Sequence, residues 1–476
     1  MRRYQWSARS ATWAIAARAF AVSALATGPL GLACTPIEPG SDLFGADAGP
    51  AATSAPFERA GSAGDELDRP STVAGCLPVR QRPTRIIGGN AGAELDADET
   101  WSCQSNYWIA APWFVRPGVS LTIGPDTRII VASGAYLLVE RGGRLVAEGT
   151  RQAPVVFSSA QPIGRRAPGD WKGIMLAGSA PTHVANATLP GSVSDARAYF
   201  GGGPSGDVDH DCGRLRFLRI EFAGGSTDEE ATPGAALALA GCGTSTLIDF
   251  VQIHRATDGL GILGGTLGIQ HVVVSNNGFG NAIEWTAGYT GPLQHVAVQG
   301  SGTGAALKGS NSESDPALEP VSHPVLYNVT AVGISPLLAS GAHYGLSLQH
   351  GSAATLRNSI ITRFDDAAIV LDSEPTIAAA TPEQISHLTL FDNGLGGATH
   401  LPRAAAALQS DSLRLRDPGL DAATNLARPD FAPTDSGVMS NIALTPPGFD
   451  PTATYRGALP FQGEDWTLGW TDYPLD

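Results

Sequence analysis

Short stretches of alternating apolar and polar residues recur through the middle of the chain. Four clean copies begin at Phe217, Phe250, His271 and His295, and each places apolar side chains at every second position. This alternation is typical of a β-strand with one buried face. A second series of short apolar stretches lies between the copies, at residues 237–239, 261–263, 283–285, 346–348 and 369–371.

The spacing of these stretches indicates a repeat. Val251, Val272 and Val296 hold equivalent places and are 21 and 24 residues apart, and the longer intervals contain extra Gly, Ser and Pro. Coils of this length that vary by loop insertion are typical of a solenoid. The sequence therefore predicts an all-β fold, a right-handed parallel β-helix whose stacked coils bury a continuous apolar column. The anchors of the first series are Leu218, Val251, Val272, Val296, Val329 and Leu388.

The alternation also assigns side chains to the two faces of each strand. Val272, Val274, Val296 and Val298 are expected to point into the column, and Gln299 is expected to face solvent.

Composition agrees with many short strands and turns, because the 476 residues include 58 Gly and 34 Pro and only 16% are charged. The net charge is −15, and four unmatched Arg residues precede Cys34, so the rest of the chain carries about −19. Nucleic acid and anionic membrane surfaces are therefore not expected as partners. We expect a monomer.

The first 33 residues are predicted to be a signal peptide, since basic residues precede an apolar run, residues 19–33, that is too short to cross a bilayer. The four residues 31–34 resemble a lipobox, in which Cys34 would be acylated. Cleavage after Ala26 is the alternative, and it would give a periplasmic or secreted protein. Acylation would make the protein an outer-membrane or cell-surface lipoprotein that touches the membrane only through its N-terminal lipid.

Three segments follow the signal peptide. Residues 34–75 are rich in Pro, Ala, Gly, Ser and acids and have almost no apolar periodicity, so we expect a disordered tether. Residues 76–400 are expected to form the β-helix. Residues 401–476 are expected to form a C-terminal cap and an extended segment that packs on the solenoid, with Trp466 and Trp470 covering an open coil end.

Four cysteines remain after Cys34, an even number that suits disulfides in an exported protein. Three pairings are possible, and we favour Cys76 with Cys103 and Cys212 with Cys242. Cys212 and Cys242 each stand just before a strand of neighbouring coils, so stacking would bring them together. Free buried thiols are the alternative.

Strand motifs that end in glycine turns lie at residues 119–127, 136–150, 154–159, 169–174, 218–224, 248–254, 264–274, 285–291, 453–458 and 466–471. These motifs resemble a largely uncharacterised family of Gram-negative surface lipoproteins with a right-handed parallel β-helix of pectate-lyase-like fold. The resemblance covers most of the chain after Trp101 and implies the same fold. Members often carry acidic clusters after the second strand, but here Asp258 and Glu284 remain without that denser pattern. Calcium usually needs six to eight oxygen ligands, so no metal site and no cofactor is predicted.

Parallel β-helices also include polysaccharide lyases and glycosidases, so the fold is compatible with catalysis. Asp365 and Asp366 are similar to the paired aspartates of polygalacturonase-like enzymes, but the Asn-Thr-Asp and Gly-His-Gly motifs of those enzymes are absent. An Asp pair at a turn is more often a solvated corner. No catalytic residue is therefore predicted.

His271 and His295 occupy equivalent places on consecutive coils, and Asn328 and His387 take the same place later. Stacked imidazoles can bind a metal, but no third ligand is specified, so a hydrogen-bonded polar ladder is favoured.

The leading hypothesis is a non-catalytic, exported, lipid-anchored β-helix that presents a binding face for a surface glycan or another protein. The alternative is a carbohydrate-active enzyme, a polysaccharide lyase or glycoside hydrolase, that uses carboxylates on the β-helix face. Trp285 and Tyr289 either stack on a sugar or pack in the core. The candidate ligand-binding residues are Glu221, His254, Asp258, Glu284, Trp285 and Tyr289.

Overall fold

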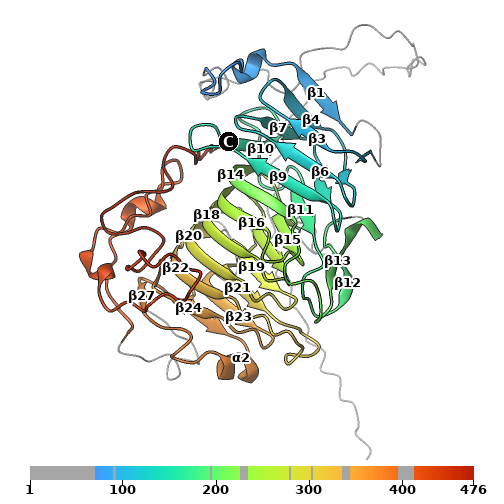
Figure 1. The fold of residues 1–476 in the computed structure, drawn as a ribbon. Helices are drawn as coiled ribbons and strands as arrows, with labels where there is room; N and C mark the ends of the chain where they lie inside the picture. The colour runs from blue at the N-terminus through green and yellow to red at the C-terminus, as the bar shows by residue number, and fades with distance from the viewer. Residues whose placement is uncertain are drawn as a thin grey trace, which may run out of the picture. The chain divides into compact units, whose positions relative to one another are not determined.

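The computed structural model describes residues 70–88, 93–192, 196–225, 234–277, 280–301, 304–334, 343–394 and 412–475. The predicted signal peptide, the predicted acylation site Cys34 and nearly all of the predicted tether lie outside these residues. The strands gather in two large parallel sheets (Figure 1). The predicted fold, an all-β right-handed parallel β-helix, is confirmed.

The first sheet has 15 strands. Four of them, β3 (Glu99–Trp101), β6 (Ser120–Ile123), β9 (Arg144–Glu148) and β24 (Thr355–Arg357), pair beside the main path. The main path runs in the order β1 (Thr84–Ile87), β4 (Asn106–Ile109), β7 (Arg128–Val131), β10 (Val155–Ser159), β14 (Gly213–Glu221), β16 (Leu247–His254), β18 (Gly268–Asn277), β20 (Pro292–Ser301), β22 (Val325–Val332), β25 (Ser359–Thr362) and β27 (Leu388–Phe391).

The second sheet has 10 strands, and each pairs with a strand of a neighbouring coil. Its order is β2 (Glu94–Leu95), β5 (Trp113–Val115), β8 (Leu137–Val139), β11 (Ile174–Ala177), β15 (Ala235–Ala240), β17 (Asp258–Leu263), β19 (Ile283–Thr286), β21 (Gly304–Ser310), β23 (His343–Gln349) and β26 (Ala367–Leu371). The remaining elements are the antiparallel pair β12 (Ala185–Thr188) and β13 (Tyr199–Gly202), helix α2 (Glu374–Ala379) and the 3-10 turns η1 (Val79–Gln81), η2 (Ala196–Ala198), η3 (Asp421–Thr424) and η4 (Ser436–Met439).

The strand register agrees with the sequence anchors and adds one coil that the anchor series lacks. Val251, Val272, Val296 and Val329 pair in succession, as the repeat predicts. The anchor of the added coil is Ser359, which pairs with Leu388 of the next coil. Ser359 has a hydroxyl group where the other anchors are aliphatic, and this hydroxyl accepts a hydrogen bond from the amide of Val329 at 3.1 Å. The apolar pattern of the sequence is therefore interrupted at this coil, which is why the anchor series passes directly from Val329 to Leu388.

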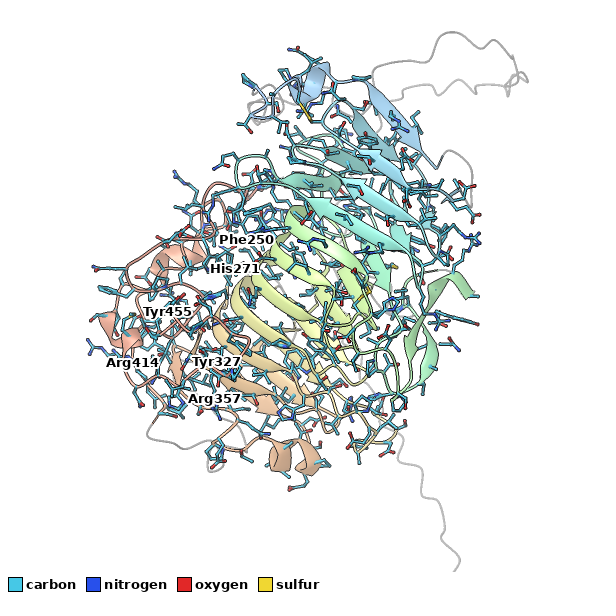
Figure 2. The ribbon with its side chains drawn as sticks, in the orientation of Figure 1. Phe250, His271, Tyr327, Arg357, Arg414 and Tyr455 are labelled. Atoms are coloured by element: carbon cyan, nitrogen blue, oxygen red, sulfur yellow. A yellow bond between two sulfur atoms is a disulfide. The ribbon has the colours of Figure 1, made fainter. Side chains whose placement is uncertain are left out.

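A residue of positive φ precedes each anchor and bends the long strands at one corner. This left-handed conformation is costly for most side chains, so its recurrence marks a shared backbone turn. Phe250 stacks on Phe217 with ring centroids 4.5 Å apart, His271 stacks on Phe250 at 4.3 Å, and His295 stacks on His271 at 4.8 Å. Figure 2 shows Phe250 and His271 side by side at this corner. The corner residues are Phe217, Phe250, His271, His295, Asn328, Asn358 and His387.

The interior column is apolar, and Val272, Val274, Val296 and Val298 all point into it with at most 1% of their surface exposed. The expectation that Gln299 faces solvent was wrong. Gln299 is fully buried, and its amide donates to the carbonyl oxygens of Ala423 at 3.0 Å and Asn425 at 2.7 Å. The C-terminal part of the chain covers this outer face, which the local pattern did not reveal.

Residues 412–475, which we call the C-terminal segment, contain little regular structure and pack along the outside of the first sheet (Figure 1). Trp466 and Trp470 were expected to cover an open coil end. They instead lie against Phe250 in the middle of the solenoid, at centroid distances of 6.4 and 5.9 Å. The stacked rings at the corner of the first sheet therefore form the surface on which these two indoles pack.

Candidate binding cleft

A cleft of about 500 Å³ lies on the outer face of β7, β10 and β14. Arg128, Val156 and Arg219 pair in register on these three strands, so their side chains form one outward row. Residues 70–72 and residues 469–474 of the C-terminal segment form the other walls. The charged residues that line the cleft are Arg82, Arg128, Arg166, Arg219, Asp126, Glu221 and Asp472.

Glu221, one of the predicted ligand-binding residues, lies in this cleft as half of a buried ion pair. Arg219 donates from Nε to Glu221 Oε1 at 3.0 Å, and Ser158 Oγ donates to Glu221 Oε2 at 3.0 Å. Arg219 also reaches Asp472 Oδ2 at 3.0 Å. A buried ion pair is costly to desolvate unless its remaining hydrogen-bonding groups are satisfied, and these contacts satisfy them. The pair fixes the floor of the cleft.

A second ion pair fixes the opposite wall. Arg82 pairs with Asp126 and also donates from Nε to the carbonyl oxygen of Leu77 at 2.7 Å. Ser71 Oγ donates to the same carboxylate of Asp126. The cleft therefore presents a mixture of fixed guanidinium and carboxylate groups rather than an apolar surface.

His254, another predicted ligand-binding residue, holds the end of the C-terminal segment. Its Nε2 lies 2.8 Å from the carbonyl oxygen of Pro474, and its Nδ1 lies 2.9 Å from Ser275 Oγ. Burial lowers the pKa of His254 to about 4, so the imidazole is neutral near pH 7. A neutral ring with Nε2 protonated donates to the Pro474 carbonyl and accepts from Ser275.

Asp258 and Glu284 lie on the second sheet and do not line this cleft. Asn281 links them, because its backbone amide donates to Asp258 Oδ1 at 2.8 Å and its side-chain amide donates to Glu284 Oε2 at 2.9 Å. Burial raises the pKa of Asp258 to about 6. Lys308 Nζ lies 3.1 Å from Glu284 Oε1. The two carboxyl groups thus sit in different electrostatic environments, an arrangement that acid and base catalysts use.

Trp285 and Tyr289 are fully buried, so neither ring offers a face to a sugar. Trp285 Nε1 donates to Ser352 Oγ at 3.2 Å, and the Tyr289 hydroxyl donates to the carbonyl oxygen of Leu267 at 3.0 Å. Burial raises the pKa of the Tyr289 hydroxyl. The expectation that these two rings stack on a sugar was therefore wrong, and both residues pack in the core.

The favoured disulfide pairing is present, with Cys76 bonded to Cys103 and Cys212 bonded to Cys242. Within the described ranges, no three His, Cys, Asp or Glu side chains gather closely enough to hold a metal ion.

The corner histidines take part in hydrogen bonds instead. His271 Nδ1 lies 2.8 Å from Asp249 Oδ1, and His295 Nδ1 lies 3.4 Å from the carbonyl oxygen of Ala458. Asp366, which with Asp365 forms the pair similar to that of polygalacturonase-like enzymes, accepts a hydrogen bond from the amide of His343 at 2.7 Å.

Sequence reasoning missed the arginines of the cleft. Arg128 and Arg219 occupy outward positions on strands, and a charged residue in such an apolar stretch is the signal that was available. Nothing local indicated that Asp472 would meet Arg219, because the two residues are separated by more than half of the chain.

A family model of the pectate-lyase-like β-helix domain matches residues 93–401, which is well over half of the chain. The chain belongs to this family. The strands β7, β10 and β14 of this pectate-lyase-like β-helix protein lie inside the matched region, whereas the C-terminal wall of the cleft lies outside it. Searches of curated proteins and of solved structures found no significant match. None of the helices in the described part of the chain is long and apolar enough to span a membrane.

Proposed function

We propose that this β-helix protein is a non-catalytic binding protein that holds a glycan in the cleft beside β7, β10 and β14. The cleft carries the proposal, because its volume of about 500 Å³ suits a small ligand. Gln152, Gln161, Ser159 and Arg166 line it and supply donors and acceptors that match sugar hydroxyl groups.

The ion pairs of the cleft favour binding over hydrolysis. Most glycosidases use two carboxyl groups that flank the scissile bond, one as a proton donor and one as a base or nucleophile. Asp126 is engaged by Arg82, and Glu221 and Asp472 are engaged by Arg219. These carboxylates therefore serve to hold the guanidinium groups in place.

The alternative function is that of a carbohydrate-active enzyme, and Asp258 with Glu284 is the pair that favours it. The raised pKa of Asp258, about 6, suits a proton donor near neutral pH, and Glu284 lies beside it through Asn281. This site is on the second sheet, so the two hypotheses make separate predictions.

We further propose that the protein is exported and anchored by acylation of Cys34 at the outer membrane or cell surface. The two disulfides favour an oxidising location such as the periplasm or the exterior. Cleavage after Ala26 remains the alternative. Comparing the membrane fraction of the wild-type protein with that of Cys34→Ser tests the anchor, because an unchanged membrane fraction would contradict acylation.

A glycan array followed by product analysis tests the proposed function. We expect binding without turnover, and Arg166→Ala should weaken it about tenfold or more, whereas the neighbouring Arg165→Ala, outside the cleft, should not. Turnover that is lost in Asp258→Asn would instead establish the enzyme. Equal binding by the two arginine variants would contradict the cleft assignment.

A further inference from the structure

The last residues of the C-terminal segment bind the flank of the β-helix as a peptide ligand would. The side-chain amide of Gln252 exchanges two hydrogen bonds with the backbone of Asp472, donating to its carbonyl oxygen at 2.7 Å and accepting from its amide at 3.0 Å. His254 binds the carbonyl oxygen of Pro474, and Arg255 donates to that of Leu475. We call residues 471–475 the latch.

The surface beneath the latch, formed by Arg219, Gln252, His254 and Arg255, is here named the latch groove. Three of its contacts are made to backbone carbonyl groups, which every peptide carries. A fourth is made to the backbone amide of Asp472, and the fifth is made to a side chain, because Arg219 Nη2 lies 3.0 Å from the carboxylate of Asp472. The groove therefore selects an extended backbone with an acidic residue at one position.

The latch groove is polar although it is covered. Arg219 is 3% exposed, and Gln252 and His254 are fully buried. Removing the latch would return these side chains to water, which solvates them well. The apolar contact that dissociation breaks is that of the Tyr473 ring with His254, at a centroid distance of 5.7 Å, and with the apolar cluster beside it. The groove also adjoins the cleft that contains Arg128 and Arg166.

We propose that the latch groove is a binding site for an acidic, extended peptide segment of another protein, and that the latch occupies this site within its own chain. The proposal goes beyond glycan binding in the cleft and does not depend on it. Pairing to the peptide backbone supplies affinity with little sequence preference, and the arginine adds the acidic requirement. The net charge of −15 disfavours acidic peptides over most of the remaining surface.

A truncated chain lacking residues 472–476 opens the site, and a labelled peptide with the sequence of Thr471–Asp476 serves as the probe. We expect the truncated chain to bind the probe at least about tenfold more tightly than the full chain, where the latch competes. A probe carrying Asp472→Asn should bind the truncated chain about tenfold more weakly. Gln252→Leu in the truncated chain should weaken binding of the original probe by a similar factor, because it removes both backbone contacts.

A second variant keeps the test valid if the truncated chain does not fold. Asp472→Asn in the full chain weakens the latch but leaves the groove intact, so this variant should bind the probe more tightly than the wild-type chain. Glu464→Gln is the matched control, because Glu464 pairs with Arg151 outside the groove and is exposed. Equal binding of the probe by the Asp472→Asn, Glu464→Gln and wild-type chains would overturn the proposal. So would a folded truncated chain that does not bind the probe.

Discussion

The C-terminal segment docks on the β-helix in two different ways. Residues 420–470, which we call the anchor, pack apolar side chains over the first sheet. The latch, residues 471–475, makes mainly polar contacts, and only the ring of Tyr473 packs against the edge of the apolar cluster. The same outward row of the β-helix lies beneath both, and it reads Arg219 and Gln252 under the latch but Val273 and Ala297 under the anchor. The apolar side chains of the anchor are Leu420, Ala423, Phe431, Val438, Ala458, Leu459, Trp466 and Trp470.

Because of this difference, we expect the anchor to stay packed permanently, whereas the latch can open and close. Lifting the anchor would expose Val273, Ala297 and Ile360 together with two indoles, and the hydrophobic effect opposes such exposure. Lifting the latch would expose mainly groups that water solvates, together with the ring of Tyr473. The outer face of the first sheet therefore changes from a permanently covered apolar surface to a potential binding surface within a few coils.

Among the substitutions proposed here, one in the interior column should have the largest effect on folding. Val296→Asp should prevent folding, because it places an unpaired charge among fully buried apolar side chains. Ser245→Asp, at an exposed turn, should change the unfolding free energy by no more than about 0.5 kcal/mol. Soluble yield and thermal denaturation of the two variants provide the check, and similar values would contradict the coil register.

Trp466→Ala tests the anchor. Trp466 lies against Phe250 and His271 and is 6% exposed, so its removal should cost roughly 3 kcal/mol of unfolding free energy. Leu468→Ala, two residues away but 63% exposed, is the control and should have little effect. Denaturant unfolding measures both. A small effect for Trp466→Ala would place the anchor in the same class as the latch.

Acid should weaken the docking of both the anchor and the latch. Burial lowers the pKa of His295, beneath the anchor, and of His254, beneath the latch, to about 4. The unfolded chain binds protons at these residues near pH 6.5, whereas the folded chain does not until about pH 4. Stability is therefore lost as pH falls through this window, by on the order of 3 kcal/mol for His295, whereas at His254 the loss is limited to the free energy of opening the latch. Unfolding midpoints between pH 7 and pH 4 should show a shallower dependence for His295→Gln than for the wild-type protein, and identical slopes would contradict this.

Removing the latch should have the smallest effect on stability. Deleting residues 472–476 removes a few hydrogen bonds, a half-exposed carboxylate and the partly buried ring of Tyr473, so we expect a loss of about 2 kcal/mol or less. Thermal denaturation of the truncated chain beside Trp466→Ala gives the comparison directly. A loss as large as that of Trp466→Ala would mean that the latch is an integral part of the fold.

The fold was predictable because each coil repeats its apolar pattern locally. The inward places of Val272 and Val296 follow from alternation alone. The coil at Ser359 was missed because its anchor is polar, and its hydroxyl group is satisfied by a neighbouring backbone amide that the sequence does not reveal.

The candidate site was much less predictable. Glu221 and His254 were identified, but Asp472, which shares Arg219 with Glu221, and Pro474, which binds His254, come from the distant end of the chain. Gln299 was assigned to solvent for the same reason, because its amide binds carbonyl groups of the C-terminal segment. Alternation shows which side chains point outward, but it does not show which of them another segment will cover.

Hydrogen exchange at two backbone amides tests the distinction between anchor and latch most directly. The amide of Ala458 donates to Thr330 Oγ1 at 2.8 Å in the anchor, and the amide of Asp472 donates to Gln252 Oε1 at 3.0 Å in the latch. Because the latch opens locally, we predict that the Asp472 amide exchanges at least about a hundredfold faster than the Ala458 amide, relative to their unfolded rates. Equal protection of the two amides would show that anchor and latch open together, and would contradict the account.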